Sequence, residues 1–200
     1  MKLLIASNNA HKVQEIEEIL SGYFDKMVTM REAGLDIDVV EDGLTFRDNA
    51  VKKATEILEK SGFDAALADD TGLCVDALGG APGVYSARYA GEGHDTDANN
   101  ALLMENMKDV PDEERTCRFT CCVALARKGL PVLAVEGKAE GILLRAPAGE
   151  NGFGYDPYFF YPPLNKSFAE LTAQEKNSVS HRRAALDALR QALDAENAAQ

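Results

Sequence analysis

Polar and charged side chains gather at four points of this 200-residue chain, where they could bind or transform a ligand. SNNAHK at 7–12 and ADDTG at 68–72 each follow a short apolar run. GFGYDP at 152–157 sets aromatic side chains among glycines, and SHRRAAL at 180–186 sets basic side chains at the start of an expected helix. Each stretch has a structural interpretation and a functional one.

The first stretch is either an ordinary helix cap or an anion site. A single Ser or Asn of this stretch would cap the helix that the apolar spacing predicts after it, with Lys12 as a solvated charge. Alternatively, free N–H groups at the helix start, the side chains of Ser7, Asn8 and Asn9, and the charge of Lys12 would bind phosphate. The stretch lacks the glycines of a Walker loop or a dinucleotide fingerprint. These residues alone leave both interpretations open.

The adjacent acids Asp69 and Asp70 follow the apolar run AALA at 65–68, which predicts a short buried strand. Two carboxylates about 4 Å apart repel by ~4 kcal/mol at an effective dielectric of 20. A magnesium ion would relieve this repulsion, since Mg²⁺ takes carboxylate and phosphate oxygens. Neighbours in a strand point to opposite faces, so one acid is expected to face the ligand. The alternative is a turn that closes the strand at Gly72.

The two late stretches suggest recognition of an aromatic ligand. Phe153 or Tyr155 could stack on a base, although a glycine-rich turn with core aromatics would look the same. His181 and Arg182 fall in the first turn of the expected helix, where cations are disfavoured by the helix dipole. That placement favours a ligand-binding role for both residues.

Composition limits the choice of partner and compartment. The net charge of −12 argues against nucleic acid and against anionic membranes. No apolar run reaches the length of a membrane span or of a signal-peptide core, so a cytoplasmic protein is expected. Of the four cysteines, Cys117, Cys121 and Cys122 lie in an alternating strand pattern and are expected to be buried thiols. They lack the spacing of a zinc site.

Hydrophobic periodicity predicts alternating strands and helices in one domain over residues 1–200. Thr45 is the expected N-cap of a helix that ends near Lys60. A hairpin through Lys128-Gly129 requires antiparallel strands, so the expected class is α/β with a mixed sheet. The other expected elements are a helix at 97–107, hairpin strands at 115–127 and 131–140, and a last helix from about residue 180.

Taken together, the motifs resemble one family along nearly the whole chain. Ser7 stands where the first motif of that family often has Thr. The family is that of the inosine triphosphate pyrophosphatases, which hydrolyse non-standard purine nucleoside triphosphates such as ITP, dITP and XTP to the monophosphate and pyrophosphate. The resemblance rests on SNNAHK, EDGLTFRDNAVKKA at 41–54, ADDTGLCVDALGGAPGVYSARYAG at 68–91, GFGYDP and SHRRAAL, in that order.

The resemblance implies a fold, a cofactor and site residues. The fold would be an elongated mixed sheet flanked by helices, with two lobes and an active-site cleft between them, in a homodimer. Asp70 would be the catalytic acid and would hold Mg²⁺ together with Glu41, for which Asp42 is the alternative. The substrate would contact Ser7, Asn8, Asn9, Ala10, His11 and Lys12 through its triphosphate, Thr71 beside the acid, and Phe153, Gly154, Tyr155, Asp156, Lys176, His181 and Arg182 through its base.

Two other functions remain open at this point. A magnesium-dependent aspartyl-phosphate phosphatase would use Asp69 or Asp70 as nucleophile, but such enzymes usually place a second Asp two residues after the first. A non-catalytic nucleotide-binding protein could keep the phosphate and base positions without needing Asp70.

Overall fold

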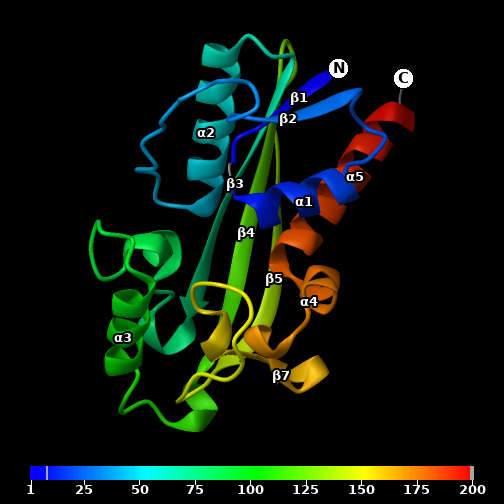
Figure 1. Ribbon diagram of the computed structural model, residues 1–200. Coiled ribbons are helices and arrows are strands. Elements are labelled where there is room, and N and C mark those ends of the chain that lie inside the picture. The colour runs from blue at the N-terminus through cyan, green and yellow to red at the C-terminus, as the bar shows by residue number, and fades with distance from the viewer. Residues whose placement is uncertain (8, 199–200) are drawn as a thin grey trace. The chain divides into compact units, whose positions relative to one another are not determined.

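The computed structural model describes residues 1–7 and 9–198, and its strands form one mixed sheet with the order β2-β1-β3-β4-β5-β6-β7, flanked by helices (Figure 1). The predicted α/β class with a mixed sheet is confirmed. None of the described helices is both long and apolar enough to cross a membrane. The strands are β1 (Lys2–Ile5), β2 (Lys26–Thr29), β3 (Ala65–Val75), β4 (Thr116–Arg127), β5 (Leu133–Leu143), β6 (Phe159–Tyr161) and β7 (Lys166–Ser167). The helices are α1 (Ala10–Ile19), α2 (Phe46–Ser61), α3 (Thr96–Asn106), α4 (Ala173–Val179) and α5 (His181–Ala198).

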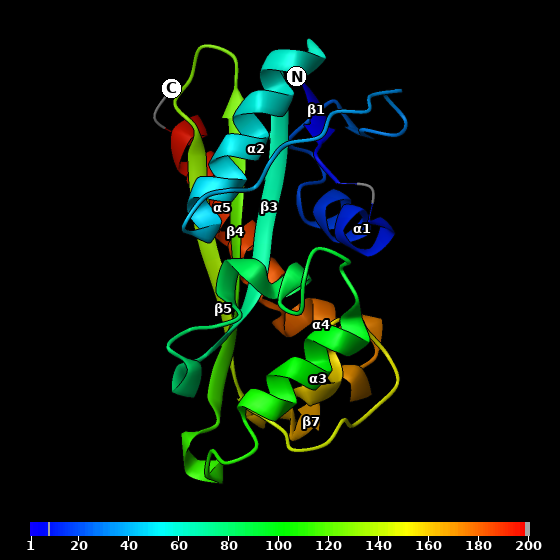
Figure 2. The ribbon, with the colours of Figure 1, turned by 90° about the vertical axis from the view of Figure 1, so that its left-hand side faces the viewer.

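The chain divides into two compact units, and β3, β4 and β5, the long strands of Figure 2, pass from one unit to the other. The division falls directly after Asp70 and directly after His181, so it separates neighbours within two of the predicted motifs. The organisation as a single domain with two lobes stays a prediction. Unit 1 comprises Met1–Asp70, Cys121–Gly137 and Arg182–Gln200, and unit 2 comprises Thr71–Thr120 and Lys138–His181.

In unit 1 both faces of the sheet are covered by helices. Strand β1 runs parallel to β2 and β3, with Leu3 opposite Met27 and Ala65. One face packs Leu3, Ile5 and Leu67 against α1 and α5, and the other packs Leu4, Ala66 and Ala68 against α2. In Figure 1, α2 accordingly lies on one side of β1 and β3, and α1 and α5 on the other.

Helix α2 begins and ends where its sequence predicts. The hydroxyl oxygen of Thr45 accepts the N–H of Asp48 at 3.1 Å, which confirms Thr45 as the N-cap. Gly62 ends the helix with φ of 72°, in the left-handed region that glycine adopts without a steric cost.

Strand β3 is longer than the sequence predicted, and this changes the setting of the two acids. The prediction ended the strand at Ala68, whereas β3 continues to Val75. Leu73 and Val75 are both fully buried, so the burial of apolar side chains resumes beyond the acids and favours an extended chain through Gly72. Asp69 and Asp70 therefore lie in the middle of a strand, which excludes the alternative of a turn that closes the strand at Gly72.

Unit 2 has its own apolar core, which is centred on aromatic rings. The Phe119 and Phe168 rings both pack against Phe159, with centroid separations of 4.7 and 4.6 Å. Strand β6 pairs antiparallel with β5 and with β7. The predicted hairpin is present as β4 and β5, which are neighbours in the sheet.

The cysteines behave as core residues. Cys117, Cys121 and Cys122 are buried, and all four cysteines carry free thiols, as predicted. Burial raises the pKa of Cys117 and of Cys122 to about 12. A thiol with so high a pKa carries little thiolate at neutral pH, so these two side chains are poor nucleophiles.

Candidate active site

The alternation of β3 sends its two adjacent acids to opposite faces of the sheet in unit 1. Leu67 packs on the face that α1 and α5 cover, and Ala68 on the face that α2 covers. Asp69 follows the parity of Leu67 and contacts α1 and α5, whereas Asp70 follows Ala68 and contacts α2. The two carboxylates therefore have different neighbours and can serve different purposes.

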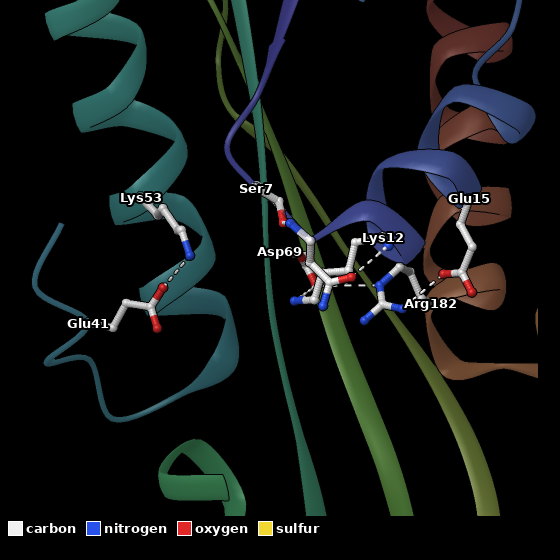
Figure 3. Close-up of polar contacts among 8 residues, drawn as sticks. Ser7, Lys12, Glu15, Glu41, Lys53, Asp69 and Arg182 are labelled. Atoms are coloured by element: carbon white, nitrogen blue, oxygen red, sulfur yellow. Dashed lines mark hydrogen bonds and ion pairs between the residues drawn. The ribbon is translucent and has the colours of Figure 1, made fainter. Parts of the chain in front are cut away.

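Asp69 belongs to a chain of four charges, three of them buried (Figure 3). Its carboxylate accepts a hydrogen bond from Nζ of Lys12 at 2.8 Å and lies 3.6 Å from Nε of Arg182. The same guanidinium donates through NH1 to Glu15 at 2.9 Å. Asp69, Arg182 and Glu15 are all buried. In sequence these residues come from β3, α1 and α5, and the fold brings them together.

The electrostatics of this chain keep both of its central groups ionised. Burial by itself would raise the pKa of Asp69, but the charges of Lys12 and Arg182 outweigh burial and hold that pKa well below its ordinary value. Burial likewise would lower the pKa of Arg182, and the negative charges around it, Asp69 first among them, raise it above its ordinary value. Asp69 is therefore a permanent anion and a poor acceptor for a proton in catalysis.

The predicted anion site at the start of α1 is partly a helix cap. The Asn9 side chain accepts the N–H of Lys12 at 3.3 Å, and the Asn9 N–H donates to the hydroxyl of Ser7 at 3.2 Å. Ala10 opens the helix, and Lys12 lies in its first turn with its ammonium turned to Asp69. Asn8 and the side chain of His11 lie outside the described part of the chain. Phosphate contacts by this stretch stay a prediction.

Asp70 is half-buried and is held from the α2 side. Nδ2 of Asn49 donates to its carboxylate at 2.9 Å, and Oδ1 of the same amide accepts the N–H of Gly43 at 2.7 Å. A Cβ on Gly43 would lie only 2.6 Å from that oxygen, so a side chain at this position would break the contact. One buried amide thus ties the catalytic candidate to the acidic loop that contains Glu41.

Glu41 and Asp42 point to different partners. Glu41 pairs with Nζ of Lys53 at 2.6 Å, and both side chains are only 26% exposed (Figure 3). Asp42 pairs with Lys52, and its side chain is 68% exposed. Burial alone would lower the pKa of Lys53, but Glu41, with further contributions from Asp69 and Asp70, raises it. A cation beside Glu41 is therefore also attracted by the negative charges of Asp69 and Asp70. This favours Glu41 over Asp42 as a metal ligand.

The donor set of unit 1 fits a hard divalent cation. No group of three or more His, Cys, Asp or Glu residues that could hold a metal ion is found in residues 1–7 and 9–198. Magnesium in phosphate-binding sites is commonly held by only one or two carboxylates together with substrate oxygens. Glu41 and Asp70 supply that number, and neither histidine nor cysteine competes among these contacts.

In unit 2 the predicted base residues form a second cluster. Lys176 pairs with the carboxylate of Asp156, and its ammonium lies 4.6 Å from the centroid of the Phe153 ring. Asp156 is buried and also accepts the N–H of Phe153 at 2.8 Å. Phe153 is 49% exposed, so part of its surface is accessible to a ligand.

The structure separates the two aromatic candidates for stacking. Tyr155 is buried in the core of unit 2, and its hydroxyl donates to the carbonyl of Ser86 at 2.8 Å, so it anchors the loop. The carbonyl of Gly154 accepts Nδ2 of Asn100 at 3.1 Å. Gly152 has φ of 79°, and a Cβ there would lie 2.3 Å from the Asp156 carboxylate, so only glycine fits.

The residues from the SHRR motif take different places. His181 is buried in unit 2 and stacks on Phe119, with centroids 4.8 Å apart. Arg182 belongs to unit 1, where its guanidinium contacts Glu15 and Asp69. Thr71 follows Asp70 on β3 and is half-buried. Base contacts by His181 and Arg182, and a substrate contact by Thr71, stay predictions.

Three site residues escaped the sequence analysis. Asn49, Lys53 and Glu15 each lie on a helix with no signal beyond ordinary polar spacing. The one available signal was the motif EDGLTFRDNAVKKA, which contains Asn49 and Lys53 together with Glu41. Reading that motif as a unit would have placed both side chains beside the acid.

Comparison with known proteins shows the family of the chain. The model of the Ham1 family matches residues 3–192. The chain belongs to the Ham1 family. The predicted family resemblance is thereby confirmed.

Individual relatives match this chain over nearly its full length. It is 52% identical to a dITP/XTP pyrophosphatase from Clostridium perfringens over 198 residues, covering 96% of this chain and 97% of that protein. A dITP/XTP pyrophosphatase from Desulforamulus reducens is 50% identical over 186 residues, covering 93% and 92% of the two chains. The solved Ham1 protein from Staphylococcus aureus superposes with a TM-score of 0.88 at 35% identity, covering 98% and 100%.

Arg182→Ala is expected to destabilise the protein strongly. The change leaves Asp69 and Glu15 buried without their shared cation, and removing one partner of a buried ion pair costs about 3–5 kcal/mol. Urea unfolding followed by circular dichroism measures the difference in the free energy of unfolding.

Arg183→Ala is the matched control. Its partner Asp187 is one helical turn away at 2.7 Å, and both side chains are about a third exposed, so the loss should stay near 0.3–0.5 kcal/mol. Equal stability of the two variants would contradict the assignment of Arg182 as the shared cation of Asp69 and Glu15.

Proposed function

We propose that the chain hydrolyses non-standard purine nucleoside triphosphates, namely ITP, dITP and XTP, to the nucleoside monophosphate and pyrophosphate. The names of the relatives support this proposal, since proteins from Clostridium perfringens and Desulforamulus reducens are dITP/XTP pyrophosphatases. The observation that carries it is that the two adjacent acids of β3 have different partners. Asp69 is neutralised by Lys12 and Arg182, whereas Asp70 is half-buried and held by a neutral amide.

Asp70 is proposed as the general base. Its carboxylate would take a proton from the water that attacks the α-phosphorus, a role that a positioned acid fills for a rate gain of about 10²–10⁴-fold. Asn49 keeps this carboxylate in place through a hydrogen bond from its neutral amide. Thr71 would contact the substrate next to the base.

Glu41 and Asp70 would hold Mg²⁺. The bound cation would supply charge neutralisation for the phosphate oxygens. Lys53, whose ammonium pairs with Glu41, would hold the loop that contains Glu41 in place. Lys12 and the start of α1, with Ser7, Asn8, Asn9, Ala10 and His11, would bind the triphosphate and stabilise the charge that grows on the leaving pyrophosphate.

The unit 2 cluster is proposed to recognise the base. Phe153 would stack on the purine, and Lys176 would donate to the 6-oxo group of hypoxanthine or xanthine. His181, in the same unit, is proposed to add a donor. The base contact of Arg182 stays a prediction. Adenine presents a 6-amino donor instead, which would leave these donors unpaired, and such a mismatch gives discrimination of about 10⁴-fold.

Cytoplasmic location and a homodimer complete the proposal. The free thiols of all four cysteines support a reducing compartment. The homodimer rests on the family resemblance. The net charge of −12 supports a small-molecule substrate rather than nucleic acid or a membrane surface.

A nucleotide panel in ¹⁸O-labelled water tests this function. With ITP, XTP, GTP, ATP and UTP, the enzyme should release pyrophosphate from ITP and XTP far faster than from ATP. Attack at the α-phosphorus should place the ¹⁸O label in the monophosphate, as read by mass spectrometry.

Other outcomes of the panel would favour the alternative functions. Label in released inorganic phosphate together with a trapped phospho-enzyme would point to an aspartyl-phosphate phosphatase. Tight binding of ITP without product would point to a nucleotide-binding protein.

Metal removal is expected to abolish turnover. Because the proposed ligands are carboxylate oxygens, EDTA should stop ITP hydrolysis and Mg²⁺ should restore it. Steady-state rates before and after chelation provide the measurement, with added Zn²⁺ as the comparison. Full turnover in metal-free buffer, or a strict need for Zn²⁺, would contradict the proposed oxygen site.

A further inference from the structure

Helix α3 in unit 2 buries two adjacent amides on the face where helix packing ordinarily uses apolar side chains. Asn99 and Asn100 are 5% and 9% exposed, and the other buried residue of the helix is Leu103. Buried polar side chains need hydrogen-bond partners to offset the loss of water. The contacts of the two amides therefore indicate why they are there.

Asn99 has partners for both ends of its amide. Its Oδ1 accepts the N–H of Ala90 at 2.7 Å, and its Nδ2 donates to the carbonyl of Ala87 at 3.0 Å. These two bonds hold the segment between β3 and α3, so stabilisation of the fold accounts for Asn99.

Asn100 differs from its neighbour. Its Nδ2 donates to the carbonyl of Gly154 at 3.1 Å, but its buried Oδ1 has no hydrogen-bond partner among the described residues. An apolar side chain would fill the same space without leaving a buried acceptor unpaired. Fold stability alone therefore does not favour asparagine at this position, and the bond to Gly154 is the contact that its amide supplies.

Gly154 lies in the loop that holds the predicted base contacts. Gly152 and Gly154 have φ of 79° and 63°, so the loop contains two residues with wide conformational freedom. Beside Gly154, the N–H of Phe153 is bonded to Asp156, and the ring of Phe153 faces the ammonium of Lys176. A shift of the Gly154 carbonyl would move the half-exposed ring of Phe153 with it.

We infer that Asn100 is a positioning residue for purine recognition: its amide fixes the Gly154 carbonyl and thereby the ring of Phe153 on which the base stacks. The inference rests on the proposed function, because it assigns Phe153 to the base. Asn100 itself contacts no substrate, and it acts through the loop from 152 to 156.

Asn100→Ala tests the inference through base selectivity. The variant should lose about 10–100-fold in kcat/KM for ITP, the loss expected when a contact group is misplaced by about 1 Å. ATP turnover, which does not depend on correct base contacts, should fall less, so the ITP:ATP ratio should shrink. Inhibition by inorganic pyrophosphate, which has no base, should keep its inhibition constant.

Asn106→Ala is the matched control, because Asn106 lies on the same helix and bonds the hydroxyl of Tyr89 at an exposed site. It should keep the ITP:ATP ratio of the wild type. Circular dichroism establishes that the compared variants are folded.

Asn100→Asp provides a second test that does not need the alanine variant to fold. An ionised carboxylate would repel the Gly154 carbonyl, whereas a protonated one can donate to it. Burial raises the pKa of a carboxyl group, so the ITP rate of this variant, divided by the wild-type rate at the same pH, should rise between about pH 8 and about pH 6.

The outcomes distinguish this inference from the proposed function. A wild-type protein with no preference among nucleotides would overturn the proposed function and the base role of the loop together. A selective wild type with an equally selective Asn100→Ala variant, or a flat pH ratio for Asn100→Asp, would overturn only the role of Asn100. A pyrophosphate inhibition constant that weakens as much as ITP turnover would also overturn it, because the damage would then extend beyond the base.

Discussion

The alternation of side chains along β3 is the constraint on which the site depends. Two acids adjacent in sequence would repel each other if they shared a face, and an extended strand sends them to opposite faces instead. Asp69 therefore meets Lys12 and Arg182, and Asp70 meets Asn49. Because both faces of the sheet are covered by helices, each acid has its own set of partners.

The two faces impose different chemistry on the same functional group. On one face, Lys12 and Arg182 hold Asp69 ionised, and Glu15 balances the second of these two cations, Arg182. On the other face, Asp70 is half-buried and accepts a hydrogen bond from the neutral amide of Asn49, which lies on the same helix as Lys53, the partner of Glu41. In unit 2 a single buried carboxylate likewise has two partners. Asp156 accepts the N–H of Phe153 and forms an ion pair with Lys176.

Local sequence patterns predicted the parts of the fold that local physics decides. The cap at Thr45, the hairpin strands and the buried cysteines followed from capping chemistry and periodicity. The length of β3 did not, because Asp-Asp-Thr-Gly has the composition of a turn and only the burial of Leu73 and Val75 overrides it. Long-range pairs such as Glu15 with Arg182, 167 residues apart, have no local signature. Motif resemblance assigned the catalytic role to Asp70, but it could not tell which partners distinguish Asp70 from Asp69.

The central claim is that Asp70 acts as the general base, whereas Asp69 stabilises the fold as the anion paired with Lys12 and Arg182. The most direct test compares Asp69→Asn with Asp70→Asn for both kcat with ITP and the free energy of unfolding. Asp70→Asn should lose about 10²–10⁴-fold in kcat with little change in stability. Asp69→Asn should lose about 3–5 kcal/mol of stability, since Arg182 and Lys12 lose their shared anion, while the folded fraction keeps most of its kcat. A stable but inactive Asp69→Asn variant beside a fully active Asp70→Asn variant would contradict the assignment.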